Sequence, residues 1–71
     1  MPKLPVIKPK ELVKVLKKLG FVEYRQKGSH LIMVLEIKNK QVVIPMHNKP
    51  LKKGTLASIL RQADVSVDEI R

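Results

Sequence analysis

The stretch HLIMVLEI, at positions 30–37, limits the possible folds of this chain more than any other segment. Its length and its apolar, partly β-branched residues predict a strand. Side chains alternate along a strand, which gives one set of Leu31, Met33 and Leu35 and another of His30, Ile32 and Val34. Both faces are then apolar, whereas an antiparallel strand with one face in water normally alternates apolar and polar residues. We therefore expect either that the sheet curls and hides both faces or that a partner covers one of them.

Residues before this strand predict a helix and a first strand. Apolar residues recur at helical spacing over 9–19, with Pro9 at the start and Gly20 as a residue that can end the helix in the left-handed conformation. Lysines occupy the other side of this helix. The segment FVEYRQK (21–27) predicts a strand, and KGS (27–29) predicts the turn into the central one.

Residues after the central strand predict a third strand and a second helix. KNK (38–40) reads as a polar turn and QVVIP (41–45) as a strand at a sheet edge, because Pro45 cannot donate a ladder hydrogen bond. After the basic loop 46–54, residues 55–63 show helical spacing, with Gly54 or Thr55 as the N-cap. Ser66 and Glu69 resemble a capping box for a short terminal helix over 67–70.

The order of these elements predicts an α+β fold, α-β-β-β-α, in which both helices cover one face of a three-stranded antiparallel sheet. We expect a single domain over 1–71, with residues 1–8 as an N-terminal arm rather than a signal peptide. No apolar run approaches the roughly 20 residues needed to cross a bilayer. Cysteine is absent, which fits a reducing compartment and excludes disulfides and thiolate metal sites.

The charge of the chain points to a polyanionic partner. Fifteen Lys and Arg residues face six Asp and Glu residues, a net charge of +9 in 71 residues. Nucleic acid is the leading partner class, because the basic positions are not joined to an exposed aromatic face that would suit a membrane. A lysine-rich surface that only favours solubility is the alternative.

His30 stands at the start of the central strand in a basic setting. Ser29 offers a hydroxyl to a phosphate oxygen, Gly28 allows close approach of a ligand, and Arg25 and Lys27 would hold an anion near the imidazole. An ordinary surface histidine is the alternative. His47 falls on the face of His30 if the 38–40 hairpin has a two-residue turn, and on the other face with a three-residue turn. It is a possible secondary site residue or simply a loop residue.

The available side chains favour one chemistry. The six acids are scattered, and two histidines alone do not make a zinc site, so we expect no metal and no cofactor. RNA carries its own nucleophile, the 2′-hydroxyl, so one general acid or base and a few cations suffice to cleave it. Candidate phosphate ligands outside the strands are Lys10 and Lys14 on the first helix, and Lys52 and Lys53 at the start of the second.

Three segments in this order resemble the HicA toxins, also called YcfA-like mRNA interferases: GSH (28–30), IPMH (44–47) and LKKGTLASILRQA (51–63). The resemblance extends over nearly the whole chain. It implies a fold similar to the double-stranded RNA-binding domain and endonucleolytic cleavage of mRNA in a bacterial or archaeal cytoplasm. It also implies His30 as the catalytic histidine and a HicB antitoxin as the partner, which would cover Ile32 and Val34. Where the family commonly has Ala-Gly after the second helix, this chain has Ala63-Asp64, and Asp can adopt the left-handed conformation at a higher cost than Gly.

Two other functions fit parts of the sequence. A non-catalytic RNA-binding module explains the basic surface but has little need for His30. A protein-interaction domain explains the apolar face and predicts no RNA binding at moderate salt. All three functions involve no membrane and no small-molecule substrate.

Overall fold

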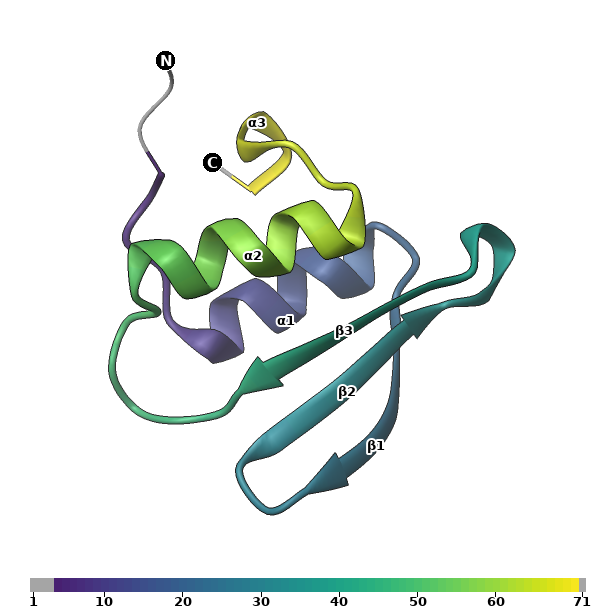
Figure 1. Ribbon diagram of the computed structural model, residues 1–71, viewed down its shortest axis with the longest axis horizontal. Helices are drawn as coiled ribbons and strands as arrows, with labels where there is room; N and C mark the ends of the chain where they lie inside the picture. Colours follow the sequence, from purple (N-terminus) through teal and green to yellow (C-terminus); the bar gives the residue numbers. More distant parts are fainter. Residues whose placement is uncertain (1–3, 71) are drawn as a thin grey trace.

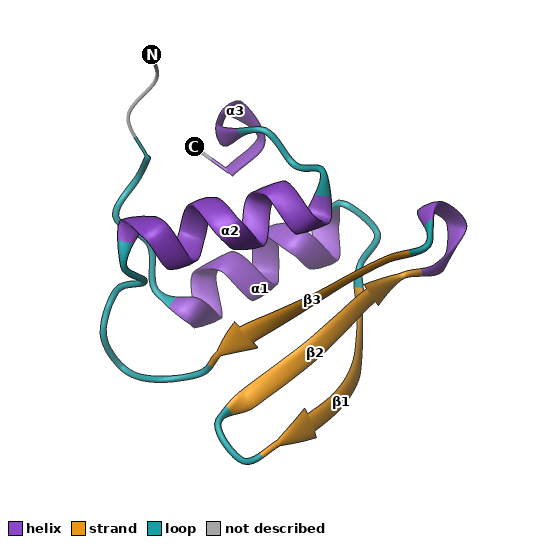
Figure 2. Ribbon diagram, viewed as in Figure 1, coloured by secondary structure: helices purple, strands orange, loops and turns teal. Residues whose placement is uncertain are grey.

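The computed structural model of the protein describes residues 4–70. Two helices and a short third one pack with three strands (Figure 1, Figure 2), and their bounds are α1 (Pro9–Lys18), β1 (Val22–Lys27), β2 (His30–Leu35), η1 (Glu36–Lys38), β3 (Lys40–Pro45), α2 (Lys53–Ala63) and α3 (Val67–Ile70). The strands form an antiparallel sheet in the order β1-β2-β3. The predicted α+β fold is confirmed. Within residues 4–70, no helix has the length and apolar character needed to cross a membrane.

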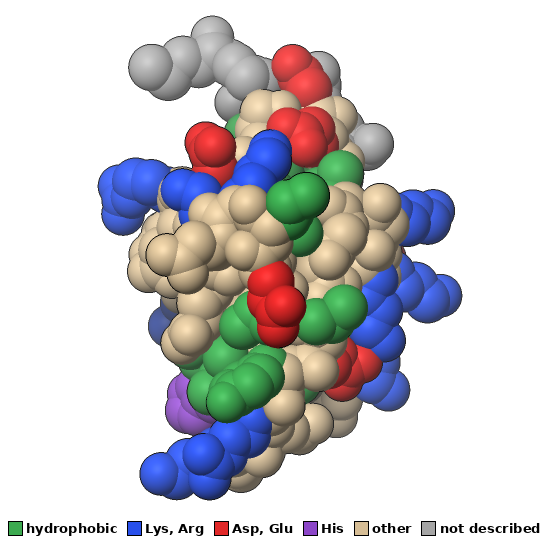
Figure 3. Space-filling view, turned by 90° about the vertical axis from the view of Figure 1, so that its right-hand side faces the viewer, with side chains coloured by type: hydrophobic (Ala, Val, Ile, Leu, Met, Phe, Trp, Pro, Cys, Tyr) green, Lys and Arg blue, Asp and Glu red, His purple; other side chains and the backbone are tan. Residues whose placement is uncertain are grey.

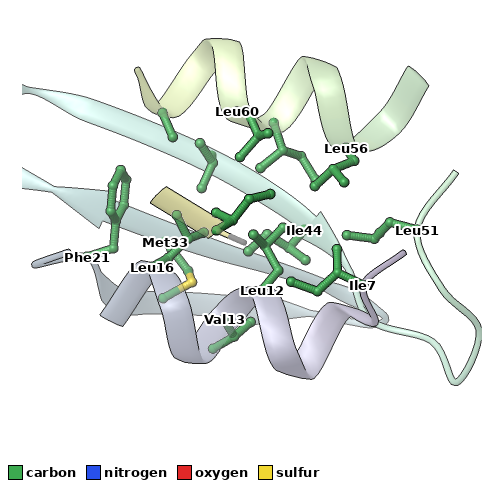
Figure 4. Close-up of a cluster of buried hydrophobic side chains, with 14 of the residues drawn as sticks. Ile7, Leu12, Val13, Leu16, Phe21, Met33, Ile44, Leu51, Leu56 and Leu60 are labelled. Atoms are coloured by element: carbon green, nitrogen blue, oxygen red, sulfur yellow. The ribbon is translucent and has the colours of Figure 1, made fainter. Parts of the chain in front are cut away.

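One apolar core joins the two long helices to a single face of the sheet. Figure 4 shows α1 and α2 directing leucines toward the side chains of β2 and β3. The buried members on these four elements are Leu12, Val13 and Leu16 of α1, Leu56, Ile59, Leu60 and Ala63 of α2, Leu31 and Met33 of β2, and Val42 and Ile44 of β3. Both helices therefore cover the same side, and the opposite side of the sheet is open. Leu31 and Met33 point inward, as their alternation predicts.

Both long helices end in the same hydrogen-bonded motif. At α1, the Phe21 N–H donates to the Leu16 carbonyl (2.9 Å) and the Gly20 N–H to the Lys17 carbonyl (3.1 Å). At α2, the Val65 N–H donates to the Leu60 carbonyl, and Asp64 takes the place of the glycine. This pair of bonds defines the Schellman motif, which needs a left-handed residue. Gly20 has φ of 103° and Asp64 has φ of 58°, so both residues adopt the predicted conformation.

The start of α2 differs from the expectation. Neither Gly54 nor Thr55 is the N-cap: the helix begins at Lys53, the N-cap is Lys52, and no side chain caps it. The Leu56 N–H already donates to the Lys52 carbonyl (2.9 Å), which extends the helix by two residues. At the other end, the Ser66 N–H donates to the Glu69 carboxylate (3.2 Å), as the predicted capping box requires.

The two hairpins have loops of different length. Lys27 pairs with His30, so Gly28 and Ser29 form a two-residue turn, with φ of 59° at Gly28. This glycine at the first turn position is typical of a type II′ turn. Between β2 and β3 the expected turn at 38–40 is wrong, because Leu35 pairs with Lys40 and residues 36–39 form the loop. The loop is a turn of 3₁₀ helix closed by Asn39 in the left-handed conformation, so β2 ends two residues earlier than expected.

An irregularity interrupts β1. Glu23 pairs with Met33 and Arg25 with Ile32, so Tyr24 is an extra residue in β1. Such a bulge places two successive side chains on one face of the strand. Every side chain of β1 is exposed, which makes this strand an edge that contributes nothing to the core. Phe21, which was expected to begin the strand, is instead buried just ahead of it.

The described part of the N-terminal arm packs on the domain. Ile7 belongs to the core, Leu4 packs against it, and the Ile7 carbonyl accepts a hydrogen bond from the Leu51 N–H (2.8 Å). Residues 1–3 of the expected arm lie outside the described residues.

The left-handed turn at Gly20 yields a stability prediction. Gly20→Ala should lower the free energy of unfolding by about 1–2 kcal/mol, because φ of 103° is strained for alanine. The new Cβ would also lie 3.1 Å from the Leu35 Cδ1 atom. Gly54→Ala is the matched control: it lies in the first turn of α2 with nothing within 4 Å, and should stabilise by a few tenths to about 1 kcal/mol. Urea denaturation measures the free energy of unfolding of both variants. Equal changes in the two would contradict the left-handed conformation assigned to Gly20.

Candidate functional site

The open face of the sheet is made of three rows of side chains. Partners directly across the ladder share a face, so the registers give the rows as Lys27, His30 and Pro45, then Arg25, Ile32 and Val43, then Val22, Val34 and Gln41. The first row lies beside the β1–β2 turn and the third beside η1. The face thus has a basic end that contains histidine and a more apolar end.

His30 lies at the basic end and is exposed. Lys27 stands directly opposite it on β1, a position at which Cβ atoms are roughly 4.5–5.5 Å apart. Arg25 lies one row further along the same face. Within residues 4–70 the imidazole makes no hydrogen bond and no ion pair. His30 therefore has no structural partner, and a cation lies beside it.

The glycine in the turn next to His30 is explained by the backbone conformation of that turn. Gly28 has a positive φ, and no atom lies within 4 Å of the position a Cβ would take, so the turn geometry alone accounts for the glycine. Ser29 is exposed, and its carbonyl accepts a hydrogen bond from the Met46 N–H, which ties the turn to the chain after β3. Within residues 4–70, the hydroxyl of Ser29 makes no hydrogen bond.

His47 lies two residues beyond the end of β3, in an exposed loop. The β2–β3 loop has four residues, rather than the two or three considered from the sequence. Like a two-residue turn, a loop with an even number of residues leaves His47 on the same face of the sheet as His30. Extending the alternation past Pro45 puts His47 on the side of His30. It would stand opposite Gly28 rather than opposite His30, so the ladder does not pair the two histidines.

The remaining candidate cations belong to the helix layer. Lys10 and Lys14 are exposed on α1, and Lys52 and Lys53 are exposed at the start of α2. Figure 1 shows that the first turns of both helices lie at the same end of the molecule as the end of β3. The predicted residues therefore form two groups, one on the sheet (Arg25, Lys27, Gly28, Ser29 and His30) and one on the helices. Lys17, on the basic side of α1, forms an ion pair with Glu23.

A comparison with known families assigns the chain to one of them. The family model described as the HicA toxin of bacterial toxin–antitoxin systems matches residues 9–65, from the first residue of α1 to just past α2. The chain belongs to the HicA toxin family. The resemblance expected from the sequence is thereby confirmed, and membership implies an antitoxin partner. A search of curated proteins gave no match.

The HicA family match spans the candidate residues and the whole sheet. The observed α-β-β-β-α order, with an antiparallel sheet and both helices on one face, agrees with the expected fold similar to the double-stranded RNA-binding domain. Among residues 4–70, no group of three or more His, Asp or Glu side chains is placed to hold a metal ion.

The apolar side chains of the open face are only partly covered. Ile32 and Val34 are half-buried, whereas Val43 and Val22 are 40% and 55% exposed. Figure 3 looks at the η1 end of the molecule and shows hydrophobic side chains gathered there, with a histidine and basic side chains at their lower edge. The sheet therefore does not curl enough to bury this face.

Tyr24 was missed as a candidate residue. It is 69% exposed and lines a hollow together with Val34 and Gln41, which places it on the open face. The bulge puts Tyr24 and Arg25 side by side on this face, although simple alternation would separate them. The signal in the sequence was that Tyr24 is the only tyrosine, and that it adjoins a candidate cation.

Proposed function

We propose that this HicA-family toxin is a metal-independent endoribonuclease that cleaves mRNA in the cytoplasm, with His30 as general acid or base. The observation that carries the proposal is the unpartnered, exposed imidazole of His30 with Lys27 directly across the ladder. A surface histidine held for structural reasons would be expected to have a hydrogen-bond partner. The net charge of +9 supports a polyanionic substrate.

The reaction needs few protein groups. The 2′-oxygen of the RNA attacks the adjacent phosphorus as its proton passes to a base, and the bond from phosphorus to the 5′-oxygen breaks as that oxygen gains a proton. The products are a 2′,3′-cyclic phosphate and a 5′-hydroxyl. His30 supplies one of these proton transfers, and the cations Lys27 and Arg25 stabilise the charge that develops on the phosphate oxygens. Ser29 and the backbone at Gly28 add hydrogen bonds to the phosphate, and His47 is a secondary candidate for the other transfer.

Phosphates further along the RNA are held by the helix layer. The first turn of α2 presents free backbone N–H groups at its positive end, and Lys52 and Lys53 add two charges with no acid in that turn. Lys10 and Lys14 extend this basic surface along α1. Because the two groups of cations lie in different layers, the RNA would pass around the end of the molecule where both helices begin.

A HicB-type antitoxin is proposed to bind the open face of the sheet over Ile32 and Val34. Partial exposure of these residues supports the proposal, as does the exposure of Val22 and Val43 beside them. A protein seated there would also stand over the row that contains His30. Inhibition would then follow from exclusion of RNA.

The catalytic role of His30 predicts a selective loss. His30→Ala should reduce cleavage about 10²- to 10⁴-fold and leave RNA affinity and thermal stability nearly unchanged, because the side chain is exposed. Cleavage by the unaltered protein should proceed in EDTA, and RNA with 2′-O-methyl groups at the cleaved positions should resist. A non-catalytic RNA-binding module would show no activity in either protein. Strict dependence on added magnesium, or rapid cutting of the methylated RNA, would exclude this mechanism.

The helix-layer cations predict an effect on binding that does not depend on RNA sequence. Exchange of Lys52 and Lys53 for Glu should weaken binding of all RNAs and flatten the dependence of affinity on salt concentration, through loss of counterion release. Fluorescence anisotropy at several salt concentrations measures both. Exchange of Lys18 and Lys38 for Glu, at the last residues of α1 and η1, makes the same change in net charge and should have a smaller effect. Equal effects would mean that only net charge matters. A pure protein-interaction domain would bind no RNA at moderate salt.

The open face predicts that folding and antitoxin binding can be separated. Val34→Asp should lower stability by about 1 kcal/mol and weaken antitoxin binding at least about tenfold. Met33→Asp, at the next residue of β2, is the matched control. The Met33 side chain is fully buried in the core, so this change should unfold the protein. If Val34→Asp also unfolds the isolated chain, the face belongs to the core, and the proposed interface is wrong.

A further inference from the structure

The hollow beside Tyr24 has a chemistry unlike that of an ordinary apolar patch. It has a volume of about 260 Å³ and is lined by Tyr24, Val34, Leu35, Glu36, Asn39, Lys40 and Gln41. The lining therefore includes an aromatic ring, two aliphatic side chains, two side-chain amides, a carboxylate and an ammonium group. Within residues 4–70, the side-chain amides of Asn39 and Gln41 make no hydrogen bond.

We propose that this hollow binds a nucleobase of single-stranded RNA, stacked on the ring of Tyr24, with its edge facing the amides. The inference rests on the proposed endoribonuclease function and adds a substrate-binding site to it. Aromatic side chains next to cations are the usual platforms for unpaired bases, because every base has a face that can stack. Asn and Gln amides both donate and accept, so they suit base edges.

The position of the hollow fits a nucleotide that flanks the cleaved bond. Val34 and His30 lie on the same face of β2, four residues apart, which corresponds to about 13 Å along the strand. Arg25 lies between them in the middle row and can hold an intervening phosphate. The bulge makes this continuous arrangement possible, since it directs Tyr24 and Arg25 to the same face.

Glu36 favours a base over a phosphate as occupant, because it offsets the charge of Lys40 in the same lining. A carboxylate in the lining repels a phosphate, but it can accept hydrogen bonds from the amino groups of a base. The polar residues of the lining also favour a base over an aliphatic side chain of a protein partner, which would leave both side-chain amides unpaired.

The single tyrosine allows a direct test, because the chain has one tyrosine and no tryptophan. The protein with His30→Ala is expected to bind RNA and to cleave it about 10²- to 10⁴-fold more slowly, so its tyrosine emission can be followed as a short single-stranded RNA with a terminal label is added. Stacking should quench this emission in parallel with the rise in anisotropy of the label. Tyr24→Leu in the same background keeps apolar area but removes the ring, and should lower affinity about 5- to 100-fold. Tyr24→Phe keeps the ring and should bind within about twofold of the parent.

Further variants separate stacking from general effects. Ile37→Ala removes an 89% exposed apolar side chain at the same end of the sheet and should leave RNA affinity unchanged. In the cleaving protein, Gln41→Ala should alter the preferred base beside the cut, whereas Asn39 is left intact because its left-handed backbone closes the loop. Circular dichroism and thermal melting confirm that each variant is folded.

The possible outcomes distinguish the two proposals. Tight RNA binding with unchanged tyrosine emission and no effect of Tyr24→Leu would overturn the stacking site and leave the proposed function standing. If Tyr24→Leu loses antitoxin binding but keeps RNA binding, the hollow belongs to the interface with the protein partner. That result would also overturn the stacking site. If no variant binds RNA, the proposed function fails, and this inference fails with it.

Discussion

The burial of Leu31 and Met33 between the sheet and the two helices is the contact on which the rest of the structure depends. A strand has a side-chain period of two, so a shift of one residue would turn these two side chains to water and bring His30 and Ile32 to the core. Met33 is fully buried and Leu31 is 3% exposed, which makes such a shift costly. The apolar core thus determines which side chains reach the open face, although none of the candidate residues belongs to it.

Elements with a strong local signal were predicted well from the sequence. The α1 helix has its stripe of leucines, a proline at the start and a glycine at the end, and all three features agree with each other. Asp64 adopts the left-handed conformation in place of glycine because the two Schellman hydrogen bonds and the burial of Ala63 and Ile70 on either side hold the chain there. The side of β2 that carries His30 followed from simple alternation.

Features that depend on long-range pairing could not be predicted in this way. Glu36, Ile37 and Lys38 alternate polar and apolar residues as a half-exposed strand does, so only the pairing of Leu35 with Lys40 reveals the loop. No capping side chain marks the start of α2, because a backbone carbonyl alone begins it. The bulge at Tyr24 is a property of the β1–β2 ladder and has no signature in β1 itself, which is why Arg25 could be predicted as a site residue and Tyr24 was missed.

The two edges of the sheet have a consequence for the free protein. Within residues 4–70, no other strand pairs with the outer edge of β1 or of β3, and such edges invite pairing with a second chain and then aggregation. On β1 the bulge distorts the row of N–H and C=O groups, and three charged side chains, Glu23, Arg25 and Lys27, crowd it. On β3 a lysine begins the strand and a proline ends it, which removes one donor. The irregularity that brings Tyr24 to the open face therefore also opposes edge-to-edge pairing of one toxin chain with another.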